Sequence, residues 1–153
     1  MTYSPTAAFN AIDEYSRLAL RTDIETASPH RLILLLMDGA LEKLRAAKTA
    51  MARGNIATKG SSITWAMSII DGLRASLNHE RGGQLAANLD ALYDYMTRTL
   101  LEANLRNDAD KLVEVEKLLG EIRAGWKGIE SQVERGNAQP VHNEIGATAR
   151  VYG

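Results

Sequence analysis

The stretch DADKLVEVEKLLGEIRAGWKGIESQV, residues 108–133, decides the fold class of this chain. Its large apolar residues recur at alternating steps of three and four: Leu112, Val115, Leu119, Ile122, Trp126, Ile129 and Val133. This spacing places them on one stripe of an α-helix, as in helices that pack at a shallow angle in a bundle. Asp108 stands just before the stripe, where an aspartate caps a helix. We therefore predict a helix over residues 109–134.

Similar periodicity upstream predicts helices over residues 29–53, 56–79 and 84–106. Ser28 followed by Pro29 is typical of a helix start, because serine caps the free N–H groups and proline fits the first helical position. The connections between these segments are short, which makes consecutive long helices antiparallel neighbours.

No segment shows sustained alternation of apolar and polar residues, so a sheet is not expected. We predict an all-α fold, an antiparallel up-down-up-down four-helix bundle over residues 1–135. Within it, residues 1–25 form an N-terminal cap segment with a short amphipathic helix. Residues 136–153 are expected to be a disordered tail.

Composition excludes several classes of function. The chain has 153 residues, no cysteine and a net charge of -1, without a basic block. A disulfide framework, a thiolate metal site and nucleic-acid binding are therefore not expected. There is no signal-peptide pattern, and no apolar run approaches the ~18 residues of a membrane span. We expect a cytoplasmic protein that does not insert into membranes.

The titratable residues do not suggest catalysis. None of the three histidines has a glutamate three residues earlier, as the metal sites of helical bundles require. No nucleophile elbow and no phosphate loop can be found either. We predict a protein that is not an enzyme and has no metal or cofactor. His79 leaves one alternative open, a histidine phosphotransfer bundle.

Some apolar residues point away from the seam of the predicted bundle. Steps of about 100° per residue place Leu34 and Leu41 to one side of the first helix and Leu35 behind it. In the second helix, Trp65 and Ile69 share an off-seam stripe with the small Gly72. Such a surplus is typical of a groove that binds an amphipathic helix, although neighbouring helices could also cover it.

The predicted partner-binding residues are Leu34, Leu35, Leu41, Trp65, Ile69, Gly72, Tyr93 and Met96. A removable cover for this surface is predicted in the N-terminal segment, where Phe9, Ile12 and Tyr15 recur at steps of three. These residues would mimic the anchors of a partner helix and compete with it. The same apolar surface could also pair with a second copy, so both a monomer and a homodimer remain open.

A set of motifs in fixed order resembles the FliS family of flagellar secretion chaperones. It comprises TASP at residues 26–29, L-x-x-x-L-M-D-G-A from Leu32, Gly82-Gly83, N-L-x-x-L-Y-x-Y-M at residues 88–96, E-V-x-x-L-L at residues 114–119, and Trp126. The resemblance covers about residues 24–129, and the ordered set is far more specific than any single motif.

This resemblance implies an antiparallel helical bundle in the cytoplasm that binds the disordered C-terminal segment of newly made flagellin. Binding would prevent premature filament assembly and hold the subunit for the flagellar type III secretion apparatus, whose export gate components are further expected partners. In the family, a segment before TASP can occupy part of the binding surface. An adaptor bundle for another helical partner remains the second alternative.

Overall fold

The computed structural model describes residues 28–129, which form four α-helices. They are α2 (Pro29–Ala52), α3 (Ile56–Ala75), α4 (His79–Arg106) and α5 (Ala109–Gly128). No strand occurs between residues 28 and 129. The all-α prediction is confirmed.

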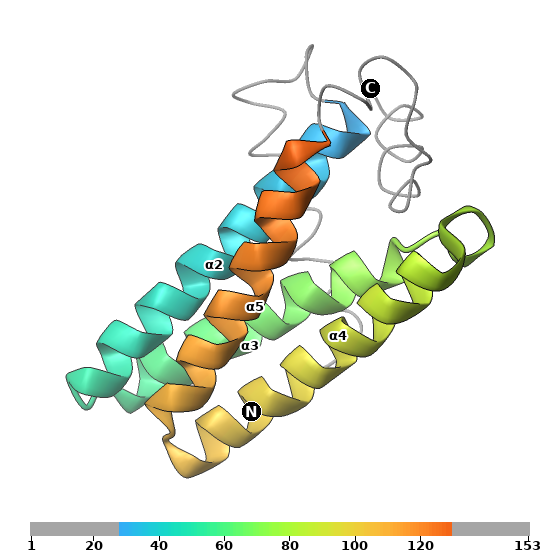
Figure 1. Ribbon diagram of the computed structural model, residues 1–153. Coiled ribbons are helices and arrows are strands. Elements are labelled where there is room, and N and C mark those ends of the chain that lie inside the picture. The colour runs from blue at the N-terminus through green and yellow to red at the C-terminus, as the bar shows by residue number, and fades with distance from the viewer. Residues whose placement is uncertain (1–27, 130–153) are drawn as a thin grey trace.

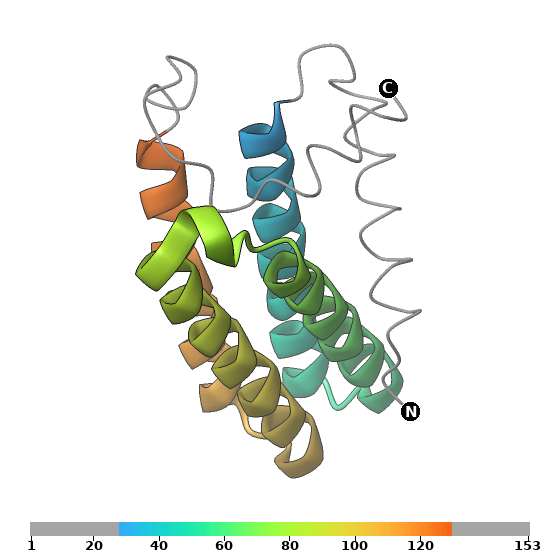
Figure 2. The same ribbon diagram turned by 90° about the vertical axis from the view of Figure 1, so that its right-hand side faces the viewer.

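The four helices form a closed ring of neighbours. α2 packs against α3 and α5, and α4 packs against the same two helices from the other side. Figures 1 and 2 show α2 beside α5 and α3 beside α4, with the chain direction alternating from one helix to the next. The connections after Ala52 and Arg106 are short, so the chain reverses direction at each of them.

Side-chain caps fix where the helices begin. The Ser28 hydroxyl accepts a hydrogen bond from the Arg31 N–H at 3.1 Å, and Pro29 follows at the first helical position. The Asp108 carboxylate accepts one from the Asp110 N–H at 3.0 Å. Both caps were predicted from the sequence, and both are confirmed because capping depends on residues only two or three positions apart.

The boundary between α3 and α4 differs from the prediction. α3 ends at Ala75 rather than at 79, and α4 begins at His79 rather than at 84. The Asn78 side chain accepts a hydrogen bond from the Arg81 N–H and so caps an extra helical turn. Gly83 then interrupts α4 with φ 51° and ψ -126°, a conformation that glycine adopts without a side-chain clash. The chain is therefore helical on both sides of this break at Gly83.

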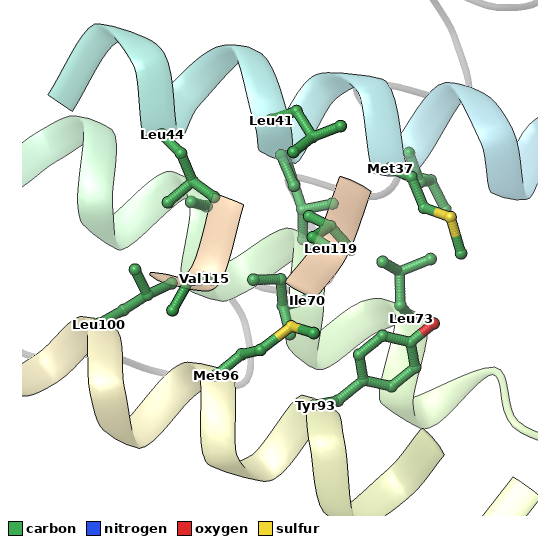
Figure 3. Packing of buried hydrophobic residues seen from close by; sticks show 14 of the residues in the cluster. Met37, Leu41, Leu44, Ile70, Leu73, Tyr93, Met96, Leu100, Val115 and Leu119 are labelled. Atoms are coloured by element: carbon green, nitrogen blue, oxygen red, sulfur yellow. The ribbon is translucent and has the colours of Figure 1, made fainter. Parts of the chain in front are cut away.

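The core lies along the seams of the bundle. The predicted stripe on α5 is buried at Leu112, Val115, Leu119 and Trp126, with Ile122 and Ile129 partly buried against the core. Figure 3 shows Val115 and Leu119 of α5 among side chains from the other three helices. Leu85, which follows the break at Gly83, is exposed and does not contribute to the core.

Ion pairs join different helices of the bundle. Arg123 of α5 binds the Asp38 carboxylate of α2, and Lys48 of α2 pairs with Glu116 of α5 at 3.1 Å. A third pair joins Lys111 of α5 to Glu102 of α4. Each pair is partly exposed, so its contribution to the free energy of unfolding is small.

Candidate partner-binding surface

The predicted partner-binding residues come from three helices. Leu34, Leu35 and Leu41 lie on α2; Trp65, Ile69 and Gly72 lie on α3; Tyr93 and Met96 lie on α4. Since α2 packs against α3 and α3 against α4, the set extends over two helix–helix contacts. The structure therefore brings the eight residues into neighbouring elements, but it does not leave all of them equally accessible.

Five of the eight predicted surface residues belong to the buried core: Leu34, Leu41 and Ile69 on α2 and α3, and Tyr93 and Met96 on α4. The expectation that they lie off the seam assumed one packed face per helix. α2 instead contacts both α3 and α5, and α3 contacts both α2 and α4. The buried arc of each helix is therefore wide enough to include residues about 100° from the first seam. Gly72 is buried as well.

Tyr93 and Met96 lie inside the bundle. Figure 3 shows both pointing from α4 toward Ile70 and Leu73 of α3. Each is fully buried. Burial raises the pKa of the Tyr93 phenol above its usual value, because an ionised oxygen would lose its hydration. At this position the neutral ring acts as a large apolar core residue.

Leu35 and Trp65 are the accessible members of the predicted set, since both side chains are only half-buried. Trp65 packs its ring against the core, and the Lys43 ammonium lies 5.3 Å from the ring centroid. The ammonium is attracted to the face of the indole ring, so a charged group lies directly beside the apolar surface of Trp65. Both side chains therefore keep part of their surface accessible.

The predicted cover residues Phe9, Ile12 and Tyr15 lie outside residues 28–129, which the structure describes. They stay a prediction from sequence, as does the assignment of residues 136–153 to a tail.

Trp126 is held by two contacts with the start of α2. Its indole N–H donates a hydrogen bond to the His30 carbonyl oxygen at 3.0 Å. The two aromatic rings stack with centroids 4.6 Å apart and an interplanar angle of 11°. His30 is itself buried, which the sequence did not indicate. The contact joins the end of α5 to the beginning of α2.

His79 is exposed at the first position of α4, directly after the capping residue Asn78. Residues 28–129 contain no cluster of three or more histidine and carboxylate side chains that could hold a metal ion. None of the helices described here combines the length and apolarity needed to cross a lipid bilayer.

Sequence reasoning missed the environment of Lys59 on α3. This lysine is buried, and its ammonium donates hydrogen bonds to the Asn104 carbonyl oxygen at 3.1 Å and to the Asn107 side-chain oxygen at 3.2 Å. Lysine is rarely buried, so composition gave no signal. The burial of Lys59 could be recognised only from the position of the end of α4, which carries both of its acceptors.

Comparison with known proteins agrees with the motifs. The family described as "Flagellar protein FliS" matches residues 11–133. The Flagellar secretion chaperone FliSB of Pseudomonas aeruginosa is 49% identical over 122 residues, which cover 80% of this chain and 97% of the relative. The Flagellar secretion chaperone FliS of Salmonella typhimurium is 46% identical over 121 residues, 78% of this chain and 90% of the relative. The relatives carry the name of a chaperone and not of an enzyme, in line with the sequence analysis. With a family match over most of its length and relatives this similar, the chain belongs to the FliS family of flagellar secretion chaperones.

Proposed function

We propose that this protein is a cytoplasmic export chaperone that binds the disordered C-terminal segment of flagellin. It keeps the segment from assembling into filament too early and supports its delivery to the flagellar type III secretion apparatus. The observation that carries this proposal is the 49% identity to a flagellar secretion chaperone that is covered over 97% of its length. The motifs of the resemblance lie within the matched residues 11–133.

The half-buried side chains Leu35 and Trp65 support a binding surface on α2 and α3. They lie on adjacent helices, and apolar side chains of a client helix could bury the rest of their surface. The other six predicted residues are buried in the bundle: Leu34, Leu41, Ile69, Gly72, Tyr93 and Met96. We propose that these buried residues enter the interface only in part.

A client segment that folds on binding combines a large buried area with moderate affinity. Ordering of the backbone costs ~1 to 2 kcal/mol per residue, which offsets much of the gain from apolar burial. For an export chaperone this balance is useful, because the client must be released again. The Lys43 ammonium beside Trp65 adds a position for an acidic or polar group at the edge of the interface.

Calorimetry with the cognate flagellin tests the proposal. We expect binding that disappears when the last ~40 residues of flagellin are deleted, a length sufficient for two or three helices. The heat-capacity change should be strongly negative, as for coupled folding and apolar burial. Absence of binding would contradict the proposed function. Binding that survives the deletion would point to an adaptor bundle with a different client site.

A second measurement separates the phosphotransfer alternative. Incubation with acetyl phosphate or a phosphorylated response regulator, with His79→Ala as control, should leave this protein unlabelled. Transfer of phosphate to His79 would overturn the proposed function in favour of a relay.

A further inference from the structure

An open pocket of about 270 Å³ lies at the end of the bundle where α2 and α3 connect and α4 ends. We call it the end pocket. Its apolar walls include Met51, Ile56 and Leu105. Ile56 and Leu105 are the most exposed large apolar residues of residues 28–129, at 75% and 76%. Leu101, one helical turn before Leu105, is also exposed and extends the apolar strip along α4.

A buried cation lines the same pocket. Lys59 is 6% exposed, and two of its three ammonium N–H groups bond to the Asn104 carbonyl and the Asn107 side chain. Both acceptors are neutral, and both belong to the C-terminal end of α4. The third N–H has no partner within residues 28–129. A buried ammonium without a carboxylate loses hydration that two neutral oxygens replace only in part.

The surroundings of Lys59 add positive charge. No aspartate or glutamate lines the end pocket. Arg53 and Arg106, which flank it in sequence, are exposed and form no ion pair in the part of the chain that the structure describes. Nearby acidic groups are already engaged: Asp108 caps α5, and Glu102 pairs with Lys111. The pocket therefore combines apolar walls with an uncompensated cation.

Capping of α4 alone does not require this arrangement. At the end of α4, Asn107 has φ 53°, and its N–H donates a hydrogen bond to the Ala103 carbonyl oxygen. The dipole of α4 favours any hydrogen-bond donor near this end of the helix. A neutral donor would serve as well without the cost of a buried charge. The charge is useful if an anion arrives from the open side of the pocket.

We propose that the end pocket binds an amphipathic client helix through a glutamate or aspartate side chain one turn away from a leucine or isoleucine. The aliphatic side chain would pack between Ile56 and Leu105, and the carboxylate would accept the remaining Lys59 N–H. This pocket is separate from the surface around Leu35 and Trp65. The assignment of this helix to flagellin rests on the proposed function. The recognition of the two side chains by the pocket is independent of it.

Methyl NMR of the full chain with two capped helical peptides tests the recognition directly. One peptide carries a leucine and a glutamate at positions i and i+4, and the other has glutamine in place of the glutamate. We expect the acidic peptide to shift the methyl signals of Ile56 and Leu105 and to bind about tenfold more tightly than its neutral match, since the hydrogen bond to a charged group is lost in the latter. Lys59→Met should abolish this difference.

Three outcomes would overturn the proposal: equal affinity of the two peptides, a difference that persists in Lys59→Met, or shifts confined to other residues. Because Lys59→Met also removes contacts to α4, Leu105→Ser provides a second variant at an exposed site. It should weaken the acidic peptide at least about fivefold while leaving the melting temperature unchanged. The matched control is Leu85→Ser, an exposed leucine at the other end of α4, which should change neither quantity.

The same variants with flagellin show whether the client uses the pocket. A loss of affinity in Leu105→Ser but not in Leu85→Ser supports that use, and equal affinities contradict it. If flagellin does not bind the unmodified protein, the proposed function fails, whereas the peptide measurement still decides what the pocket recognises.

Discussion

At the scale of single residues, the two tryptophans illustrate how position separates stability from binding. Trp126 is buried, stacks on His30 and donates a hydrogen bond to its carbonyl oxygen. Trp65 is half-buried under Lys43. Both rings contact the core, but Trp126 is buried whereas Trp65 keeps part of its surface accessible.

Substitution of each tryptophan by alanine should therefore give different results. We expect Trp126→Ala to lower the free energy of unfolding by ~3 to 5 kcal/mol, because a large buried ring and its hydrogen bond are lost. Trp65→Ala should cost less, ~1 to 2 kcal/mol, and should weaken flagellin binding at least about tenfold as a central aromatic anchor. Denaturant unfolding and calorimetry measure the two quantities. If both variants lose the same stability and Trp65→Ala keeps full affinity, Trp65 is a core residue only.

At the scale of helices, α3 and α4 are joined by a charged cluster at their surface. Arg74 of α3 bonds to Asp90 at 2.7 Å and to Asp94 at 3.1 Å, both on α4. The hydrogen bond to Asp90 raises the pKa of Arg74, and the same bond holds the pKa of the Asp90 carboxyl below its usual 3.8. The groups are about one third exposed, so solvent screens the pair and its contribution is small.

The lowered pKa of Asp90 predicts the direction of a pH effect. A carboxylate whose pKa is lower in the folded state stabilises the protein above its unfolded pKa, and this contribution is lost as the pH falls through the folded pKa. We expect Asp90→Asn to lower the free energy of unfolding by ~0.5 kcal/mol at neutral pH and by nothing measurable near pH 2. Urea unfolding at both pH values tests this. Glu121→Gln, at an exposed carboxylate without an ion pair in residues 28–129, should be neutral at both.

The break within α4 makes a second prediction at this scale. Gly83 has φ 51° and ψ -126°, and a Cβ added there would meet nothing within 4 Å. Gly83→Ala should therefore cost backbone strain alone, ~1 to 3 kcal/mol of unfolding free energy. Gly120→Ala, inside the regular helix α5 and equally free of contacts, should instead stabilise by ~0.5 to 1 kcal/mol. Thermal unfolding distinguishes the two signs. Equal shifts would mean that Gly83 does not hold this conformation in solution.

The sequence predicted those features of the helices that depend on local chemistry. The caps at Ser28 and Asp108 and the seam on α5 follow from spacing within one helix, and the structure has them. The burial of Ile69 could not be predicted in this way, because it depends on α3 packing against two partners at once. The contact between Lys59 and Asn104 likewise joins residues 45 positions apart, and no periodicity encodes it.

At the scale of the whole molecule, most of the predicted partner-binding residues are already buried. Leu34, Leu41 and Ile69 contribute to the core, so a client cannot gain the full apolar area that the sequence suggested. Under the proposed function, the binding energy comes from the half-buried residues Leu35 and Trp65, from any surface that a competing segment gives up, and from the end pocket. The cover predicted around Phe9 and Ile12 would then act as a competitor and not as a part of the fold.

Deletion of residues 1–20 tests the competing segment. If the segment occupies the client surface for about nine tenths of the time, the apparent dissociation constant of flagellin is about tenfold higher than the intrinsic one, and the deletion should remove this factor. The shortened protein should also bind more of a dye that reports exposed apolar surface, because Leu35 and Trp65 lose their cover. Deletion of residues 136–153 is the matched control and should change neither the affinity nor the dye signal. If the N-terminal deletion also changes neither, the residues around Phe9 do not compete with the client, and the affinity of this chaperone is set by α2, α3 and the end pocket alone.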